Sequence, residues 1–291
     1  MVEYISMLCQ SVSNRKQFPG CFGCGYRFEI MSTVDKALGL LQFFSLSNPE
    51  WGLSDLGRAA ALDKATLLRL LRSLERHGLI EQDAETKRFR LGTAFLTLAR
   101  IREQSFPLAT VVARWLDELS RETGETAHAS LSNGRAMTTI GISEPQRATR
   151  VFVDPSEPLP FHATASGIVF LAFGPDDVRE TVLSQAGFVS YTETTDTSPA
   201  VIRRRIEDAR RLGYAASNQA FERDTIGIAV PLFDKNAQAM GAIAVATPLM
   251  RMTKELQATI LGCLMRTSVA MAESLGGALP PGFASIARGH A

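Results

Sequence analysis

The sequence lacks any hydrophobic run that could cross a membrane. A spanning helix needs about 20 consecutive apolar residues, whereas the longest apolar stretches of this chain carry charges or end in glycine and proline. The first thirty residues also place Glu3, Arg15, Lys16 and Arg27 among their apolar residues, unlike the apolar core of a secretory signal. We therefore expect a cytoplasmic protein with no membrane partner.

The chain also has almost no excess of charge of either sign. Its 291 residues contain 31 Lys and Arg and 30 Asp and Glu, which gives a net charge of +1, and 45% of them are hydrophobic. Chains that are disordered throughout have few apolar residues and a large net charge, so this composition indicates a folded protein. Because a domain contains roughly 100–200 residues on average, the length predicts two domains.

Cysteine is scarce, and three of the four cysteines lie in the first thirty residues. Cys21 and Cys24 form a single Cys-x-x-Cys, but a structural zinc site needs four ligands and no second pair follows. We therefore expect no metal ion and no cofactor, and we interpret residues 1–30 as an irregular leader. Two hypotheses stay open: Cys9, Cys21 and Cys24 make the protein a sensor of redox state or metal, or translation starts at Met31, where the pattern becomes regular.

The sequence signatures of common catalytic sites are absent too. The chain has no Gly-x-Ser-x-Gly motif and no phosphate-binding glycine loop. Its four histidines are scattered at positions 77, 128, 162 and 290, which gives no local catalytic cluster. We therefore expect that the protein is not an enzyme.

A helical pattern followed by a short hairpin begins at Met31. Apolar residues at helical spacing predict three short helices between Val34 and His77. Two short strands at 79–82 and 88–91 follow, joined by a polar loop. Three helices and a hairpin in this order predict a winged helix-turn-helix domain over residues 31–95.

The last of these helices, expected from about Lys64 to His77, separates an apolar stripe from a basic face. Its leucines recur at helical spacing, and arginines lie off that stripe. Residues 64–90 contain seven basic and four acidic side chains. Because the DNA major groove admits a helix and basic side chains bind phosphates, the pattern favours DNA over the alternative partner, another protein.

The second half of the chain predicts a different domain. A linker helix is expected over 96–123, with its apolar face running from about Pro107 to Thr123. Asn133-Gly134 predicts a hairpin turn between two strands. Helices, two further strands and a final helix follow. Hairpin strands with helices segregated between them indicate an antiparallel α+β domain over 124–277, and residues 278–291 are interpreted as a tail.

Motifs in both halves resemble the isocitrate lyase regulator (IclR) family of bacterial transcription factors. Residues 62–71, Leu-Asp-Lys-Ala-Thr-Leu-Leu-Arg-Leu-Leu, resemble the recognition-helix signature of the family. Residues 160–167 resemble its Leu-His-Ala-Thr-Ala-Ser-Gly segment, and residues 213–251 resemble its C-terminal block of strands. The resemblance covers about residues 32–275, nearly the whole chain.

The resemblance implies a transcriptional regulator that binds a pseudo-palindromic operator in double-stranded DNA as a homodimer or homotetramer. Three residues depart from the recognition-helix signature: Asp63, Ala65 and Leu68 replace proline, serine and histidine or tyrosine, which implies a different operator. The DNA-binding residues carried over to this chain are Lys64, Thr66, Leu68, Arg69, Arg72, Lys87 and Arg88.

The resemblance also implies a C-terminal effector domain similar to the GAF fold. The effector-binding positions carried over are Ala165, Ser166, Ser217, Thr225, Gly227, Ala244 and Ala246. Some relatives have serines at the two positions on the last strand and bind small keto acids. Alanines at these two positions predict a less polar small organic acid, such as an aromatic or medium-chain carboxylic acid. The alternative is that Ala244 and Ala246 are ordinary packed strand residues.

Overall fold

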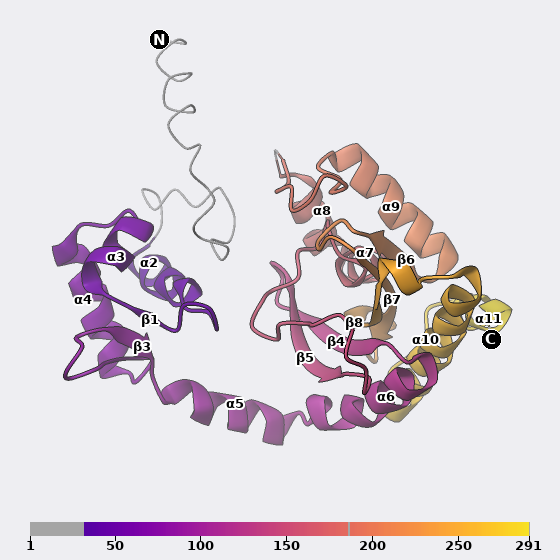
Figure 1. Ribbon diagram of the computed structural model, residues 1–291, viewed down its shortest axis with the longest axis horizontal. Helices are drawn as coiled ribbons and strands as arrows, with labels where there is room; N and C mark the ends of the chain where they lie inside the picture. Colours follow the sequence, from indigo (N-terminus) through magenta and orange to yellow (C-terminus); the bar gives the residue numbers. More distant parts are fainter. Residues whose placement is uncertain (1–31, 186, 291) are drawn as a thin grey trace, which may run out of the picture. The chain divides into compact units, whose positions relative to one another are not determined.

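The computed structural model describes residues 32–185 and 187–290. The chain divides into two compact units, the first ending at Arg102 and the second beginning at Glu103 (Figure 1). The first combines short helices with a small antiparallel sheet, and the second combines a larger antiparallel sheet with helices. The α+β class predicted from the sequence is confirmed.

The N-terminal unit is a winged helix-turn-helix. Its first helices are α2 (Thr33–Gly39), the 3-10 helix η4 (Leu40–Phe43), α3 (Leu53–Ala59) and α4 (Lys64–Arg76). The hairpin of β2 (Ile80–Gln82) and β3 (Phe89–Leu91) follows, and β1 (Glu50–Trp51) pairs with β3 to complete a sheet of order β1-β3-β2. The sequence pattern predicts the hairpin but not β1.

Helix α4 begins and ends where its local sequence predicts. The Asp63 side chain accepts a hydrogen bond from the Thr66 backbone N–H at 2.9 Å, which satisfies one of the free amides of the first turn. Gly78 follows the helix with a φ of 68°, a left-handed conformation that glycine adopts without a steric penalty.

One face of α4 forms the core of the N-terminal unit. Its buried residues pack against Leu40, Leu56, Ile80 and Phe89 from the other elements. The α4 residues in this core are Leu67, Leu70, Leu71 and Leu74. The opposite face of the helix is therefore free to bind a partner.

The connection between the two halves differs from the single linker helix predicted over 96–123. It consists of α5 (Ala94–Ser105) and α6 (Leu108–Thr123), which are interrupted at Pro107. Proline disfavours the helical conformation of the residue before it and has no N–H to donate, so the helix stops before Phe106. The helix that the sequence predicts from about Pro107 to Thr123 is therefore α6, whereas α5 was not predicted as a separate helix.

The C-terminal unit is built on a five-stranded antiparallel sheet of order β5-β4-β8-β7-β6. The sequence predicts four of these strands and misses the short β6. The strands are β4 (Thr126–Ser132), β5 (Met137–Ser143), β6 (Ala215–Asn218), β7 (Thr225–Phe233) and β8 (Ala239–Pro248).

Helices cover both faces of this sheet. Alternate residues of a strand point to opposite sides, so apolar residues along β7 and β8 need a packing partner on each face. Ile228 and Val245 pack on the face covered by α6 and α10 (Lys254–Ser274). Ala229 and Ala244 pack on the other face, against helices α7, α8 and α9 (Figure 1). These three helices are α7 (Ala165–Phe173), α8 (Asp176–Leu183) and α9 (Pro199–Leu212).

The end of the chain contributes to the core. Residues interpreted as a tail contain α11 (Phe283–His290), and the Phe283 side chain is fully buried. Its ring lies edge-on to Phe233, with ring centroids 4.9 Å apart. The sequence analysis does not predict this helix.

Candidate DNA interface and effector cavity

Helix α4 presents a polar and basic face to solvent. Lys64 and Arg69 are exposed, and neither forms an ion pair with another described residue. Leu68, at 37% exposure, lies between them on this face, and Thr66 is half-buried. Arg72 is exposed and donates to the Glu75 carboxylate at 2.6 Å. The predicted recognition residues of α4 therefore all lie off its buried leucine stripe, and their contact with DNA stays a prediction.

The wing places its two basic residues in different surroundings. Lys87 is exposed and has a φ of 56°, which turns the chain at the end of the hairpin loop. Arg88 donates to the backbone oxygen of Glu50 at 2.8 Å, and its side chain is 43% exposed. Lys87 is therefore free to bind a phosphate, whereas Arg88 also anchors strand β1 to the wing.

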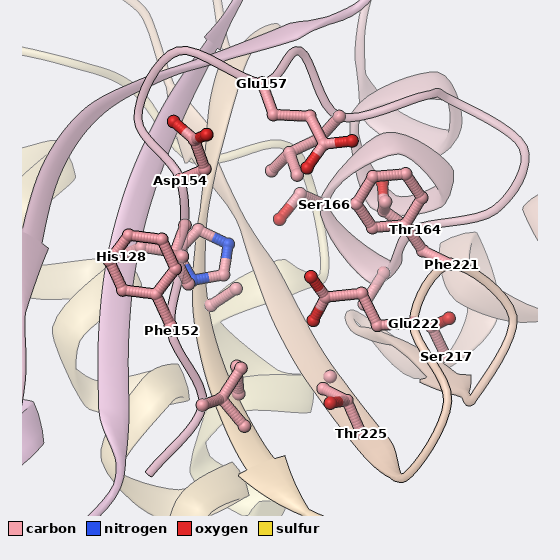
Figure 2. Close-up of a pocket in the computed structure, with 17 residues that line it drawn as sticks. His128, Phe152, Asp154, Glu157, Thr164, Ser166, Ser217, Phe221, Glu222 and Thr225 are labelled. Carbon is pink, nitrogen blue, oxygen red and sulfur yellow. The ribbon is translucent and has the colours of Figure 1, made fainter. Parts of the chain in front are cut away.

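A cavity of about 70 Å³ lies within the C-terminal unit, against one face of the sheet (Figure 2). The strand register accounts for part of its wall, because Ser217 pairs with Gly227 and Gly227 pairs with Ala246. The structure brings all seven predicted effector-binding residues together in this wall, namely Ala165, Ser166, Ser217, Thr225, Gly227, Ala244 and Ala246. That they bind an effector stays a prediction.

The N-terminus of α7 reaches the cavity because the chain folds closely around it. The Thr164 hydroxyl accepts from the Gly167 backbone N–H at 3.0 Å and caps the helix. A side chain on Gly167 would meet the Phe161 backbone at 2.3 Å, so only glycine fits there. Ala165 and Ser166, which occupy the first turn, thereby line the cavity.

The other residues of the cavity wall were not predicted from the sequence. Several come from the segment between β5 and α7. There, Val151, Phe152 and Val153 alternate as in a strand: the two valines are buried and Phe152 is 63% exposed, a pattern that could have been recognised in the sequence. The remaining lining residues are His128, Val151, Phe152, Val153, Asp154, Glu157, Leu159, Thr164, Phe221 and Glu222.

Two of the buried polar groups in the wall have no partner in the described part of the chain. Ser166 is 2% exposed, and its hydroxyl forms no hydrogen bond with a described residue. His128 is 7% exposed, and its Nδ1 also lacks a partner there. Burial lowers the pKa of His128 to about 4, so its imidazole is neutral at pH 7.

No group of three or more His, Cys, Asp or Glu side chains within residues 32–185 and 187–290 is arranged to hold a metal ion. Cys9, Cys21 and Cys24 lie outside the described residues. Cys263 donates to the Glu122 carboxylate at 3.0 Å, and burial raises the pKa of its thiol to about 11. A thiol with this pKa is poorly reactive.

Within residues 32–185 and 187–290, no helix has both the length and the apolar composition needed to span a membrane.

Comparison with known families covers both units. The family model of the IclR helix-turn-helix domain matches residues 33–84, and the model of the bacterial transcriptional regulator IclR C-terminal region matches residues 103–272. The second match alone spans more than half of the chain. The chain belongs to the IclR family. It is therefore a member of a family of DNA-binding transcriptional regulators, as its sequence motifs predict.

Two of the similar proteins are transcriptional regulators that this chain matches over most of their length. The HTH-type transcriptional regulator XynR of Escherichia coli K12 is 28% identical over 85% of this chain and 98% of XynR. The HTH-type transcriptional regulator BhcR of Paracoccus denitrificans is 30% identical over 76% of this chain and 78% of BhcR. These matches agree with a role that is not enzymatic.

Solved structures of IclR regulators share the fold. A putative IclR regulator from Silicibacter sp. TM1040 is 40% identical, with a TM-score of 0.79 over 86% of this chain and 98% of that chain. An IclR homologue from Microbacterium hydrocarbonoxydans, solved in complex with 4-hydroxybenzoate, is 25% identical, with a TM-score of 0.64 over 84% and 99% of the two chains.

Proposed function

We propose that this protein is a transcriptional regulator whose binding to its operator responds to a small organic molecule held in the cavity of the C-terminal unit. The observation that carries the proposal is the convergence of seven predicted effector-binding residues on that cavity, in a chain that also has a winged helix-turn-helix. Ligand binding acts by favouring either the DNA-competent or the DNA-incompetent state of the regulator.

The DNA-binding surface consists of the exposed face of α4 and the wing. Lys64, Thr66 and Arg69 read base edges in the major groove, Leu68 makes an apolar contact there, and Arg72, Lys87 and Arg88 bind phosphates. The regulator acts as a homodimer or homotetramer. A two-fold assembly reads a pseudo-palindrome whose half-sites are about one helical turn, 34–36 Å, or a multiple of it apart.

The effector is a small organic acid, and an aromatic acid suits the cavity wall. Phe152 and Phe221 line the cavity together with the methyl groups of Ala244 and Ala246, which offer apolar contacts to a ring. The backbone N–H groups of Ala165 and Ser166, at the start of α7, are suitable donors to a carboxylate, because they have no partner within the helix and the helix dipole favours negative charge there. The IclR homologue with bound 4-hydroxybenzoate supports this ligand class.

A ligand screen on the purified protein tests the effector proposal. We expect aromatic acids such as 4-hydroxybenzoate to raise the melting temperature more than glyoxylate or pyruvate does, and to change operator binding in a gel-shift assay over the same concentration range. An equal or larger stabilisation by glyoxylate or pyruvate would contradict the preference for apolar acids. Ligands that stabilise the protein without any change in operator binding would contradict the regulatory role.

Lys87→Ala is expected to weaken binding to all DNA sequences about equally. The exposed Lys87 ammonium is placed to bind a phosphate, and phosphate contacts carry no sequence information. The slope of log affinity against log salt concentration should therefore fall by about one. Titrations of operator and random DNA at several salt concentrations measure both effects. A loss confined to the operator would show that Lys87 contributes to base recognition instead.

A further inference from the structure

All the charged side chains that line the cavity are acidic. Among the described residues, Asp154, Glu157 and Glu222 line it, whereas no lysine or arginine does. The basic residue next to Glu222 does not neutralise it, since Arg223 pairs with Glu193 at 3.0 Å. A simple organic acid that entered this cavity would therefore meet three carboxylates and no basic side chain.

Two of these three carboxylates also lack partners of their own. Asp154 accepts hydrogen bonds from the backbone and hydroxyl of Ser156, at 2.8 and 2.7 Å. The side-chain carboxylates of Glu157 and Glu222 form neither an ion pair nor a hydrogen bond with any described residue. Figure 2 shows both carboxylates directed toward the space enclosed by the lining residues. The two glutamates are thus available to a bound ligand.

The electrostatics of the free cavity favour a positive charge at this place. Partial burial raises the pKa of Glu222, and the nearby charge of Glu157 raises it further. The pKa of Glu157 is raised in the same way, by partial burial and then by Asp154. A cation placed among these groups would relieve their mutual repulsion.

The α7 side of the cavity has the opposite preference. The backbone N–H groups of Ala165 and Ser166 and the unpartnered Ser166 hydroxyl are available to donate hydrogen bonds, and the helix dipole favours negative charge at this end. Ser166 is almost fully buried and lines the cavity, so a hydrogen-bond partner for its hydroxyl has to lie in the cavity. This buried donor is evidence for a ligand that is independent of the acidic cluster.

Two aromatic rings complete the wall. Phe152 and Phe221 lie on opposite sides of the cavity in Figure 2. An aromatic ring attracts a cation through its face and also packs against the apolar part of a ligand. The cavity therefore combines a donor-rich end, apolar walls and a carboxylate-rich end.

We propose that the effector is an amino-bearing organic acid, which places its ammonium group between Glu157 and Glu222 and its carboxylate at the N-terminus of α7. The proposal rests on the proposed function and refines its ligand class. It explains why the cavity combines acidic side chains with the helix terminus that binds anions. The preferred ligand is thus a zwitterion instead of a simple carboxylic acid.

Matched pairs of ligands test this inference on the full-length protein. Each pair differs only by an amino group: γ-aminobutyrate with butyrate, and 4-(aminomethyl)benzoate with 4-methylbenzoate. We expect the amino-bearing member to bind about 10- to 100-fold more tightly by calorimetry, because hydrogen bonds to charged groups are the strong ones. The same member should shift operator binding at the lower concentration.

Charge-removing variants locate the ammonium site. Glu222→Gln and Glu157→Gln keep the size of each side chain but remove its charge, and each should lose most of the preference for the amino-bearing ligand. Glu193→Gln is the matched control, because Glu193 is an 87% exposed glutamate outside the cavity lining. Its preference should match that of the unaltered protein.

The outcomes separate this inference from the proposed function. If the simple acids bind as tightly as their amino partners and release or strengthen operator binding, the zwitterion inference is overturned and the proposed function stands. A preference that survives in both glutamine variants also overturns the inference. If no member of either pair binds and operator binding is insensitive to all small organic acids, both proposals fail.

Discussion

Arg69→Ala is expected to abolish sequence-specific operator binding while the protein remains folded. Arg69 lies on the exposed face of α4, where it forms no ion pair with a described residue, so its removal costs the fold little. A bidentate contact between arginine and guanine contributes about 1–3 kcal/mol of discrimination, which corresponds to roughly 10- to 100-fold in affinity. Gel-shift titrations of operator against random DNA measure the loss.

Arg69→Lys is the matched control for this variant. Lysine keeps the positive charge but lacks the planar fork of donors that arginine offers to a guanine. We therefore expect Arg69→Lys to retain binding to random DNA and to lose most of the discrimination. Circular dichroism and thermal melting should match the unaltered protein for both variants. If Arg69→Ala binds its operator with unchanged discrimination, α4 does not read bases through Arg69.

Arg251→Ala is expected to destabilise the C-terminal unit by about 3 kcal/mol. Glu125, just before strand β4, is completely buried, and the Arg251 guanidinium donates to both of its carboxylate oxygens, at 2.7 and 2.5 Å. Arg251 also donates to the backbone oxygen of Thr149 at 2.9 Å. Among the described residues, removing Arg251 leaves Arg147, at 3.9 Å, as the only cation within ion-pair distance of the buried carboxylate.

Urea unfolding followed by tryptophan fluorescence and circular dichroism measures this loss. The double variant Arg251→Ala with Glu125→Gln should recover part of the stability, because it also removes the buried charge. Arg211→Ala serves as control: its ion pair with Asp208 is exposed, and such pairs contribute about 0–1 kcal/mol. An Arg251→Ala variant as stable as this control would show that the buried pair does not hold the unit together.

The parts of the fold that the sequence predicts are those with strong local signals. Helix α4 has a capping carboxylate at Asp63, a leucine stripe and a glycine at its end, so its bounds follow from neighbouring residues. The Asn133-Gly134 turn similarly marks the β4–β5 hairpin. In such segments the local preferences agree with the tertiary structure.

The elements that the sequence does not predict depend on distant contacts. Strand β1 has only two residues, and its pairing with β3 exists only once the wing has folded. Helix α11 has no long periodic pattern and is held through Phe283 in the core of the C-terminal unit. In the linker, the helix predicted from about Pro107 to Thr123 corresponds to α6, and the separate helix α5 before it was not predicted.

Part of the candidate effector site was likewise predicted from the sequence, and part was not. Its strand and helix positions, such as Ser217 and Ala165, follow from the resemblance to the family. The acidic residues Asp154, Glu157 and Glu222 come from irregular segments, where no periodic pattern indicates which way a side chain points. The charge of the cavity, and with it the inferred ligand class, therefore emerges only from the three-dimensional structure.

Footprinting of the purified full-length protein on the DNA beside its own gene, at physiological salt, tests the central claim most directly. The account predicts protection of one pseudo-palindromic site, and a change of that protection when a ligand of the cavity is added. Protection should be absent with Arg69→Ala at the same concentration. Diffuse binding that disappears with salt, both with and without the organic acids, would contradict a ligand-responsive, operator-specific regulator.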